Sequence, residues 1–215
     1  TVIYEDRDRN LWVGNGYNGL NLFDRERESF SRFEKNLNDS TSLGGNDIRT
    51  IYEDTKGCLW IGTSGGGLNL FDKKTHKFKQ FKVQSNRKNW IGSDYVNSIV
   101  EDGKGNLWIG SSEGMIIYYD RVKEQFENYI VYPDYQGDIR NSTYCHLMLD
   151  EGKLWFGTEV GLLYMDVNTR KINHIKSSAA NYYIANYPIT SFVRYGADLL
   201  VIGTDHGGLF LYDKR

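Results

Sequence analysis

Apolar and polar residues alternate in short stretches along this chain, and turn-forming residues separate the stretches. The clearest stretch runs from Ile48 to Asp54, where the side chains alternate as they do in a half-buried strand. Further strand-like stretches cover residues 59–63, 68–71 and 77–81. The segments between them contain Asp and Gly, which favour tight turns because Asp bonds to nearby backbone and Gly accepts a positive φ. The pattern predicts four short antiparallel strands in succession.

This four-strand pattern occurs five times. Trp60, in the second predicted strand, is matched by Trp12, Trp108, Trp155 and Val201, so the period is 48, 48, 47 and 46 residues. A fixed period of this length is typical of a β-propeller, in which each blade is a four-stranded antiparallel sheet. We therefore expect an all-β fold, with one partial propeller over residues 1–215 and blades at about 1–35, 47–83, 95–131, 143–176 and 188–213.

The fifth unit departs from the pattern. Its strands are expected over Ile189–Arg194, Leu200–Gly203 and Leu209–Tyr212, and no fourth strand precedes Arg215. Propellers close by pairing their ends, and here no terminal strand remains to complete the last blade. The five blades, the last of them incomplete, are therefore expected to be a fragment of a larger propeller.

The segments that link the blades lack the strand pattern, and in a propeller they share one face with the turns between second and third strands. Loops on a rigid scaffold are where binding residues concentrate. Periodic Trp residues are expected in the blade core, whereas aromatic residues outside the period are free to bind sugars through their rings or to pack the loops onto the blades. The candidate ligand-binding residues are Tyr17, Asn18, Trp90, Tyr95, Glu113, Glu159, Tyr182, Tyr183, Asp205 and His206.

The segment Asn38 to Leu43, leading into Ile48–Asp54 and then Leu59–Thr63, resembles a known repeat. It is similar to the two-component regulator propeller repeat, and the resemblance extends over all five units. That repeat forms the sensor region of bacterial hybrid two-component systems that respond to complex carbohydrates. The resemblance implies a periplasmic location and an oligosaccharide ligand. It also implies a homodimer formed through the full-length protein, with a membrane span and a histidine kinase outside this chain.

Other chemistry is poorly supported by the sequence. The Glu-Asp pairs at 5–6, 53–54 and 101–102 recur with the period, as turn residues do, whereas a catalytic pair need occur only once. The four His residues show no metal-ligand spacing, and the Gly runs join strands without a following helix that could bind phosphate. A net charge of -2 gives no case for nucleic acid. We expect no metal, no cofactor and no catalysis in this segment.

The leading hypothesis is a ligand-sensing propeller segment that binds an oligosaccharide and passes the signal to a cytoplasmic kinase. Two alternatives stay open. In the first, the same aromatic residues form a protein interface and the propeller is an interaction scaffold. In the second, loop residues give the propeller lyase or hydrolase activity.

Overall fold

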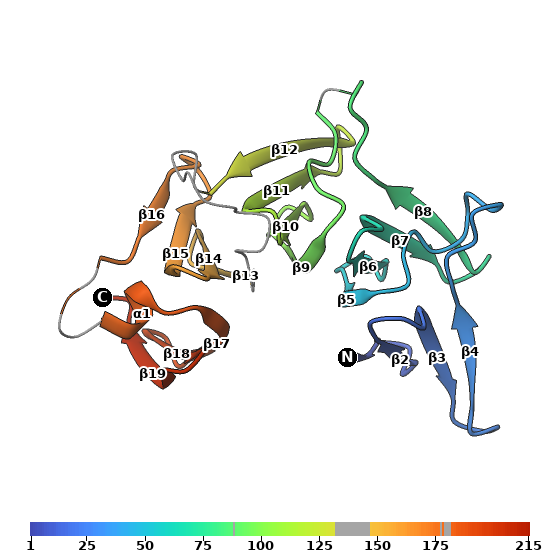
Figure 1. Cartoon of the computed structure of the whole chain (residues 1–215), viewed down its shortest axis with the longest axis horizontal. Coiled ribbons are helices and arrows are strands. Elements are labelled where there is room, and N and C mark those ends of the chain that lie inside the picture. Colours follow the sequence, from blue (N-terminus) through green and yellow to red (C-terminus); the bar gives the residue numbers. More distant parts are fainter. Residues whose placement is uncertain (88, 132–146, 177, 179–181) are drawn as a thin grey trace. The chain divides into compact units, whose positions relative to one another are not determined.

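The computed structural model describes residues 1–87, 89–131, 147–176, 178 and 182–215, with only the backbone of residues 182 and 183. In this part of the chain the regular structure is antiparallel β-sheet with a single short helix, α1 (Tyr182–Asn186) (Figure 1). The chain forms two compact units, one of residues 1–111 and 115–129, the other of residues 112–114 and 130–215. The prediction of an all-β fold is confirmed.

The first unit contains three four-stranded sheets, each with its strands in sequence order. We call each sheet a blade. Within this unit the first strands lie innermost and the fourth strands outermost (Figure 1). The strands are β1 (Val2–Glu5), β2 (Leu11–Gly14), β3 (Leu20–Asp24) and β4 (Ser29–Phe33); β5 (Ile48–Glu53), β6 (Leu59–Thr63), β7 (Leu68–Asp72) and β8 (Lys77–Phe81); and β9 (Val96–Glu101), β10 (Leu107–Ser111), β11 (Met115–Asp120) and β12 (Gln125–Ile130).

The second unit contains the fourth and fifth blades. The fifth has three strands in the order β17-β18-β19, as predicted. The first strand of the fourth blade was expected to begin at Tyr144, a position outside the described residues. The strands are β13 (Leu147–Asp150), β14 (Lys153–Thr158), β15 (Gly161–Asp166) and β16 (Ile172–His174), then β17 (Ile189–Tyr195), β18 (Leu199–Thr204) and β19 (Gly208–Asp213).

The periodic Trp residues lie in the core, as predicted, and they join consecutive blades. Trp12, Trp60 and Trp155 are each 1% exposed. Each packs edge-on against an aromatic residue on the third strand of the following blade: Trp12 against Phe71 at 5.2 Å, Trp60 against Tyr119 at 5.9 Å, and Trp155 against Tyr212 at 5.9 Å between ring centroids. Such edge-to-face pairs add to the free energy of burial. The repeated Trp therefore holds neighbouring blades together.

The Gly at or near the end of the second strand has an inter-blade cause in the first, second and fourth blades. A Cβ added to Gly14 would lie 2.5 Å from Ile48, and one added to Gly62 would lie 2.6 Å from Val96. Gly157 meets Ile189 in the same way, at 2.6 Å. In each pair the second residue begins the first strand of the next blade. Gly recurs because any side chain would push the next blade away.

The Glu-Asp pairs build turns, as predicted. Asp54 Oδ1 accepts the backbone N–H groups of Lys56 and Cys58, both at 2.9 Å, and its Oδ2 accepts the indole N–H of Trp60 at 2.7 Å. Asp6 makes the same bond to Trp12 at 2.9 Å. One Asp thus fixes both the turn and the core Trp.

The fourth blade departs from this arrangement: its turn is one residue shorter, and Asp150 stands five positions before Trp155 instead of six. The buried indole N–H of Trp155 has no hydrogen-bond partner among the residues that the structure describes. Asp150 instead accepts hydrogen bonds from Arg194 and Lys214 of the fifth blade. Asp150 therefore joins the fourth blade to the fifth.

The helix α1 was not predicted from the sequence. It lies in the segment linking the fourth and fifth blades, and Ile184 anchors it with 2% exposure. A Cβ on Gly161 would lie 2.7 Å from the carbonyl oxygens of Ile184 and Ala185, so the helix backbone packs directly on the start of β15. Five residues are too few to show a helical period, which is why the sequence gives no sign of this helix.

Candidate functional site

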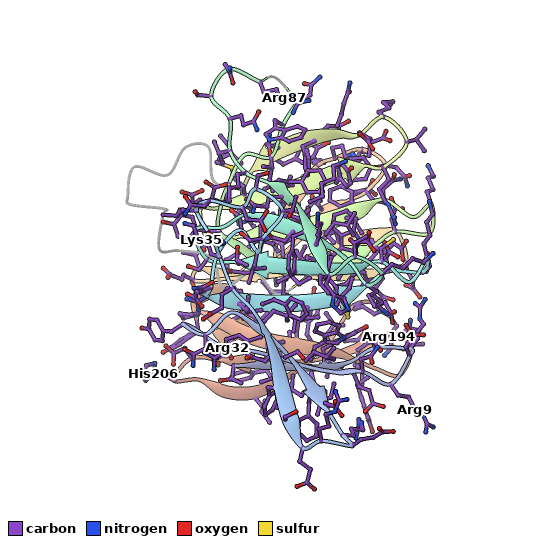
Figure 2. All side chains as sticks on the ribbon, turned by 90° about the vertical axis from the view of Figure 1, so that its right-hand side faces the viewer. Arg9, Arg32, Lys35, Arg87, Arg194 and His206 are labelled. Carbon is purple, nitrogen blue, oxygen red and sulfur yellow. The ribbon has the colours of Figure 1, made fainter. Side chains whose placement is uncertain are left out.

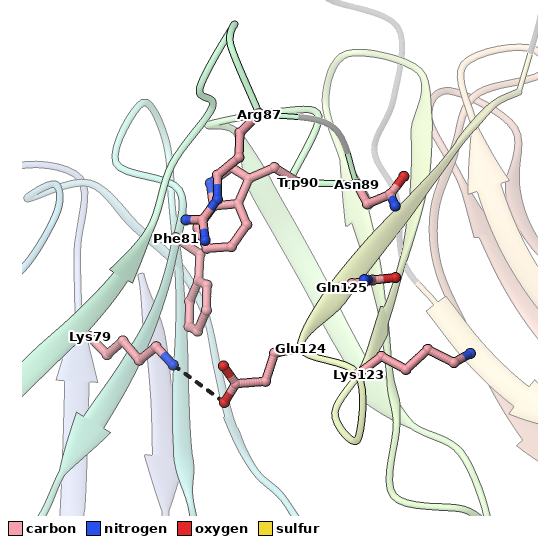
Figure 3. A pocket seen from close by; sticks show the side chains of 8 residues that line it. All are labelled: Lys79, Phe81, Arg87, Asn89, Trp90, Lys123, Glu124 and Gln125. Carbon is pink, nitrogen blue, oxygen red and sulfur yellow. Dashed lines mark ion pairs between the residues drawn. The ribbon is translucent and has the colours of Figure 1, made fainter.

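A groove on the outer side of the second and third blades is the larger of two hollows in the described part of the chain that include a predicted site residue (Figure 3). Its volume is about 490 Å³. One side is strand β8, the other is the turn that leads into β12, and the segment linking the two blades closes one end. We call it the Trp90 groove. Its lining residues are Lys79, Phe81, Arg87, Asn89, Trp90, Lys123, Glu124 and Gln125.

The linking segment is fixed to the outer strand β12 by backbone and side-chain bonds. The carbonyl of Asn89 accepts the N–H of Phe126 at 2.9 Å, and the carbonyl of Trp90 accepts the amide Nδ2 of Asn128 at 2.9 Å. Asn89 takes up this position with a left-handed backbone, φ 54°. The segment covers the outer edge of β12, which would otherwise offer unpaired backbone groups. The groove therefore has a backbone frame tied to a blade.

Trp90 is held on three sides. Its indole N–H donates to the carbonyl of Lys82 at 2.7 Å, and its ring packs against Phe81 and Phe126 at centroid distances of 5.8 and 5.5 Å. The guanidinium carbon of Arg87 lies 4.0 Å from the ring centroid, and Figure 3 shows that side chain stacked on the indole. Arg87 therefore covers one face of the indole, so the guanidinium lines the groove there in place of the ring.

The charges of the groove differ in how far they are neutralised. Lys79 Nζ lies 3.7 Å from a carboxylate oxygen of Glu124, and Lys123 Nζ lies 2.9 Å from Asp120. Arg87 forms no ion pair with any residue that the structure describes. Figure 2 shows it on a loop that projects beyond the strands of its unit. Arg87 is therefore the cation best placed to meet an anionic ligand.

A second, smaller hollow lies on the loop side of the first unit. Its volume is about 260 Å³, and Tyr17, 89% exposed, lines it together with Asp47 and Arg49, whose side chains form an ion pair at 2.7 Å. The Tyr17 turn is fixed by Asn15, whose side-chain oxygen accepts the N–H groups of Tyr17 and Asn18 at 3.1 and 2.7 Å. The backbone that carries Tyr17 is therefore fixed, but its ring is open to solvent.

The second unit has a hollow of about 710 Å³ beside strand β16. Tyr164 and Tyr212 form part of its lining. Both rings pack against the core Trp155, at centroid distances of 5.0 and 5.9 Å. Their placement follows from blade packing, so this hollow offers less independent support for a binding role.

The other predicted site residues are scattered. Tyr95 is 42% exposed and pairs with Ser64 through an isolated bridge. Glu159 is half-buried, and burial raises the pKa of its carboxyl. His206 lies 3.0 Å from Asp205 with its side chain in solvent. Glu113 is half-buried, and the side chains of Tyr182 and Tyr183, on α1, lie outside the described residues.

Of the ten candidates, Trp90 lines one hollow and Tyr17 lines another, and the six others whose side chains the structure describes line neither. Sequence reasoning missed Arg87, Lys123 and Gln125, which line the groove with Trp90. One signal in the sequence could have indicated Arg87: it lies three positions before Trp90, an aromatic residue that does not follow the period.

One carboxylate cluster has the geometry of a metal site. Oxygens of Asp6, Asp8 and Glu53 lie within 4.8 Å of one another. The ammonium of Lys73, however, lies among them, at 3.0, 2.9 and 2.8 Å respectively. Burial acts to lower the pKa of Lys73, and the three carboxylates raise it above its usual value. A protonated Lys therefore takes the place that a cation would need.

The Lys73 cluster is an ionic tie between blades, and it recurs. Lys73 follows strand β7 and reaches Asp6 and Asp8 in the preceding blade. Arg121, 48 positions later, reaches Asp54 in its preceding blade at 2.8 Å and Glu101 in its own at 3.6 Å. The acidic pairs that form the turns therefore also join blades, which accounts for the position of the cation.

Comparison with known proteins identifies the repeats. The family model described as two component regulator propeller matches residues 42–65 and 90–113. The resemblance predicted from the sequence is therefore confirmed for these segments. No curated protein matches the chain. Within the described residues, no helix has the length and apolar character that a membrane crossing requires.

Solved structures show the same fold. The extracellular domain of the hybrid two-component system BT3049 from B. thetaiotaomicron matches with a TM-score of 0.78 and 23% identity, over 98% of this chain and 26% of that one. The extracellular domain of BT4673 from the same organism matches with a TM-score of 0.75 and 22% identity, over 99% and 28%. A streptogramin B lyase matches with a TM-score of 0.61 and 15% identity, over 98% and 67%. The fold is a β-propeller, and the chain spans about a quarter of the first two relatives.

Proposed function

We propose that this chain is a propeller segment of the extracytoplasmic sensor region of a hybrid two-component system, and that it binds an oligosaccharide without changing it chemically. The observation that carries the proposal is the pair of matched repeats, residues 42–65 and 90–113. The likeness to two extracellular domains of hybrid two-component systems, over nearly all of this chain, supports the same assignment. The second repeat begins at Trp90, so the family motif and the groove share a residue.

The lining of the Trp90 groove suits binding better than catalysis. Glycoside hydrolysis ordinarily needs two carboxyl groups on opposite sides of the bond. The lining has one carboxylate, Glu124, and it is paired with Lys79. Amides at Asn89 and Gln125 offer donors and acceptors to hydroxyl groups. This supports recognition of a sugar over its cleavage.

Signal transfer in this proposal depends on position. A packed propeller blade moves as a rigid element, so a ligand changes the arrangement of domains or of a dimer more readily than the fold of one blade. The homodimer, the membrane span and the kinase belong to the full-length protein and are proposed with it. Sedimentation of the full-length protein with and without ligand would test the dimer.

The test of the proposal is calorimetric titration of the chain with a panel of neutral and acidic oligosaccharides, followed by chromatography of the recovered sugars. The expected result is saturable binding of at least one oligosaccharide, recovered unchanged. Recovery of shortened or unsaturated products would replace the sensor assignment with that of an enzyme. Absence of binding across the panel would contradict the oligosaccharide proposal and favour the alternative of a protein-interaction scaffold.

A further inference from the structure

We infer that the Trp90 groove recognises an acidic oligosaccharide, one that carries carboxylate or sulfate groups, and that Arg87 binds the anionic group. This inference rests on the proposed function, since it specifies the class of oligosaccharide that the segment binds. Four observations carry it: the stacking of Arg87 on Trp90, the anchoring of Trp90, the charge of the groove, and a comparison between two linking segments of the same chain.

The stacked guanidinium is prepared for an anion. Arg87 lies 4.0 Å above the indole of Trp90, which covers one face of the planar group. Stacking leaves the N–H donors at the edge of the plane, where carboxylate and sulfate oxygens bind through paired hydrogen bonds. Arg87 has no acidic partner in the described parts of the chain, so an incoming anion displaces none. A side chain already held by the ring also loses less entropy when the ligand binds.

Trp90 is itself immobilised, so it serves as a platform. The bond from its indole N–H to Lys82 and the packing on Phe81 and Phe126 fix its ring plane. The same contacts occupy the ring edge that would otherwise bond to sugar hydroxyls. Trp90 is therefore a positioning residue for Arg87, and neutral sugars gain little direct contact with the ring.

The charge of the groove has the matching sign. Its lining carries three cations, Lys79, Arg87 and Lys123, and one carboxylate, Glu124. Lys79 is paired with Glu124 and Lys123 with Asp120, so Arg87 supplies the positive charge that remains. Glu124 faces Lys79 at 3.7 Å across the lower part of the groove in Figure 3, away from Arg87. An acidic sugar can place its anion at Arg87 and its hydroxyls at the amides of Asn89 and Gln125.

The preceding linking segment shows that the blade frame does not require this pair of residues. Bonds recur 48 residues apart: Phe78 donates to the carbonyl of Thr41 at 2.7 Å just as Phe126 donates to Asn89 at 2.9 Å. By the same offset, Asp39 stands where Arg87 stands, and Ser42 stands where Trp90 stands. The first segment makes the equivalent backbone bond with neither a cation nor an aromatic ring at these two positions. Arg87 and Trp90 are therefore additions to the frame, which favours a role in binding.

The inference is tested by isothermal titration of the chain with three probes of the galactose series: neutral β-galactotetraose, tetragalacturonate, and a sulfated tetrasaccharide from carrageenan. We expect one or both acidic probes to bind at least about tenfold more tightly than the neutral one, because charged hydrogen bonds contribute more than neutral ones. Binding of tetragalacturonate alone identifies uronic acids as ligands, and binding of the carrageenan probe alone identifies sulfated sugars.

Two variants locate the site. Arg87→Ala is expected to weaken binding of the acidic probe by about tenfold or more, because a charged hydrogen-bond donor is lost. Arg27→Ala removes an exposed Arg in the first blade, away from the groove, and should leave binding within about twofold. Equal affinity for neutral and acidic probes, or unchanged binding in Arg87→Ala, would overturn the inference and leave the proposed function intact. Failure of all three probes and of the wider panel would overturn both.

Discussion

Replacing Lys73 with Met should destabilise the first unit strongly, because it leaves buried carboxylates without their cation. The side chains of Asp6 and Glu53 are 0% and 2% exposed, and Lys73 contacts both of them as well as Asp8. Removing one partner of a buried ion pair costs about 3–5 kcal/mol. Lys73 is 24% exposed, so water can partly replace it, and we expect a loss near the lower end, about 3 kcal/mol.

The assay is urea unfolding of wild type and variant, followed by Trp fluorescence. Lys123→Met is the matched control, because Lys123 also pairs with an Asp, at 2.9 Å, but is 65% exposed. Exposed pairs contribute about 0–1 kcal/mol. If both variants lose the same small free energy of unfolding, the carboxylate cluster is not the buried ionic tie described here.

The pH dependence of the same variant gives an independent check. Burial acts to raise the pKa of Asp6, but hydrogen bonds from Trp12, Asn10 and Lys73 lower it from 3.8 to about 2. In the wild type this adds about 2 kcal/mol of stability above pH 4, which is lost as the pH falls towards 2. Without Lys73 the folded-state pKa rises, so the deficit of the variant should shrink on acidification. A deficit that grows between pH 6 and pH 3 would refute this account.

Two further predictions concern the inter-blade frame. Trp60→Phe should cost about 1–2 kcal/mol more than Trp155→Phe in paired thermal unfolding, because it leaves buried Asp54 without its indole donor, whereas the Trp155 N–H has no partner among the described residues. Equal losses of stability would contradict this difference. Gly62→Ala should cost about 1–3 kcal/mol, because its Cβ would lie 2.6 Å from the side chain of Val96 in the next blade. Gly103→Ala meets nothing within 4 Å and should change stability by less than about 0.5 kcal/mol in urea unfolding. Similar costs for the two Gly variants would argue against close packing between blades.

The sequence determined the blades because a blade is built from local contacts that repeat. Strand alternation and the turn Asp act within one unit, and the period of Trp12, Trp60, Trp108 and Trp155 marks where each unit recurs. Predicted and observed strand bounds agree within about two residues for the described strands. The Gly after the Trp was also visible in the sequence, although its cause, the approach of the next blade, was not.

Only the tertiary structure decided the chemistry of the groove. Trp90 was recognisable as an aromatic residue outside the period, but its ring proved to be a support for Arg87 and not a free surface for a sugar. That role depends on which residues surround the ring, and Phe126 comes from the next blade, 36 positions away. The tie formed by Lys73 was hidden for the same reason, since it joins residues 65 and 67 positions apart. A repeat period specifies each blade, whereas contacts between blades depend on side-chain reach and burial, which the linear pattern does not contain.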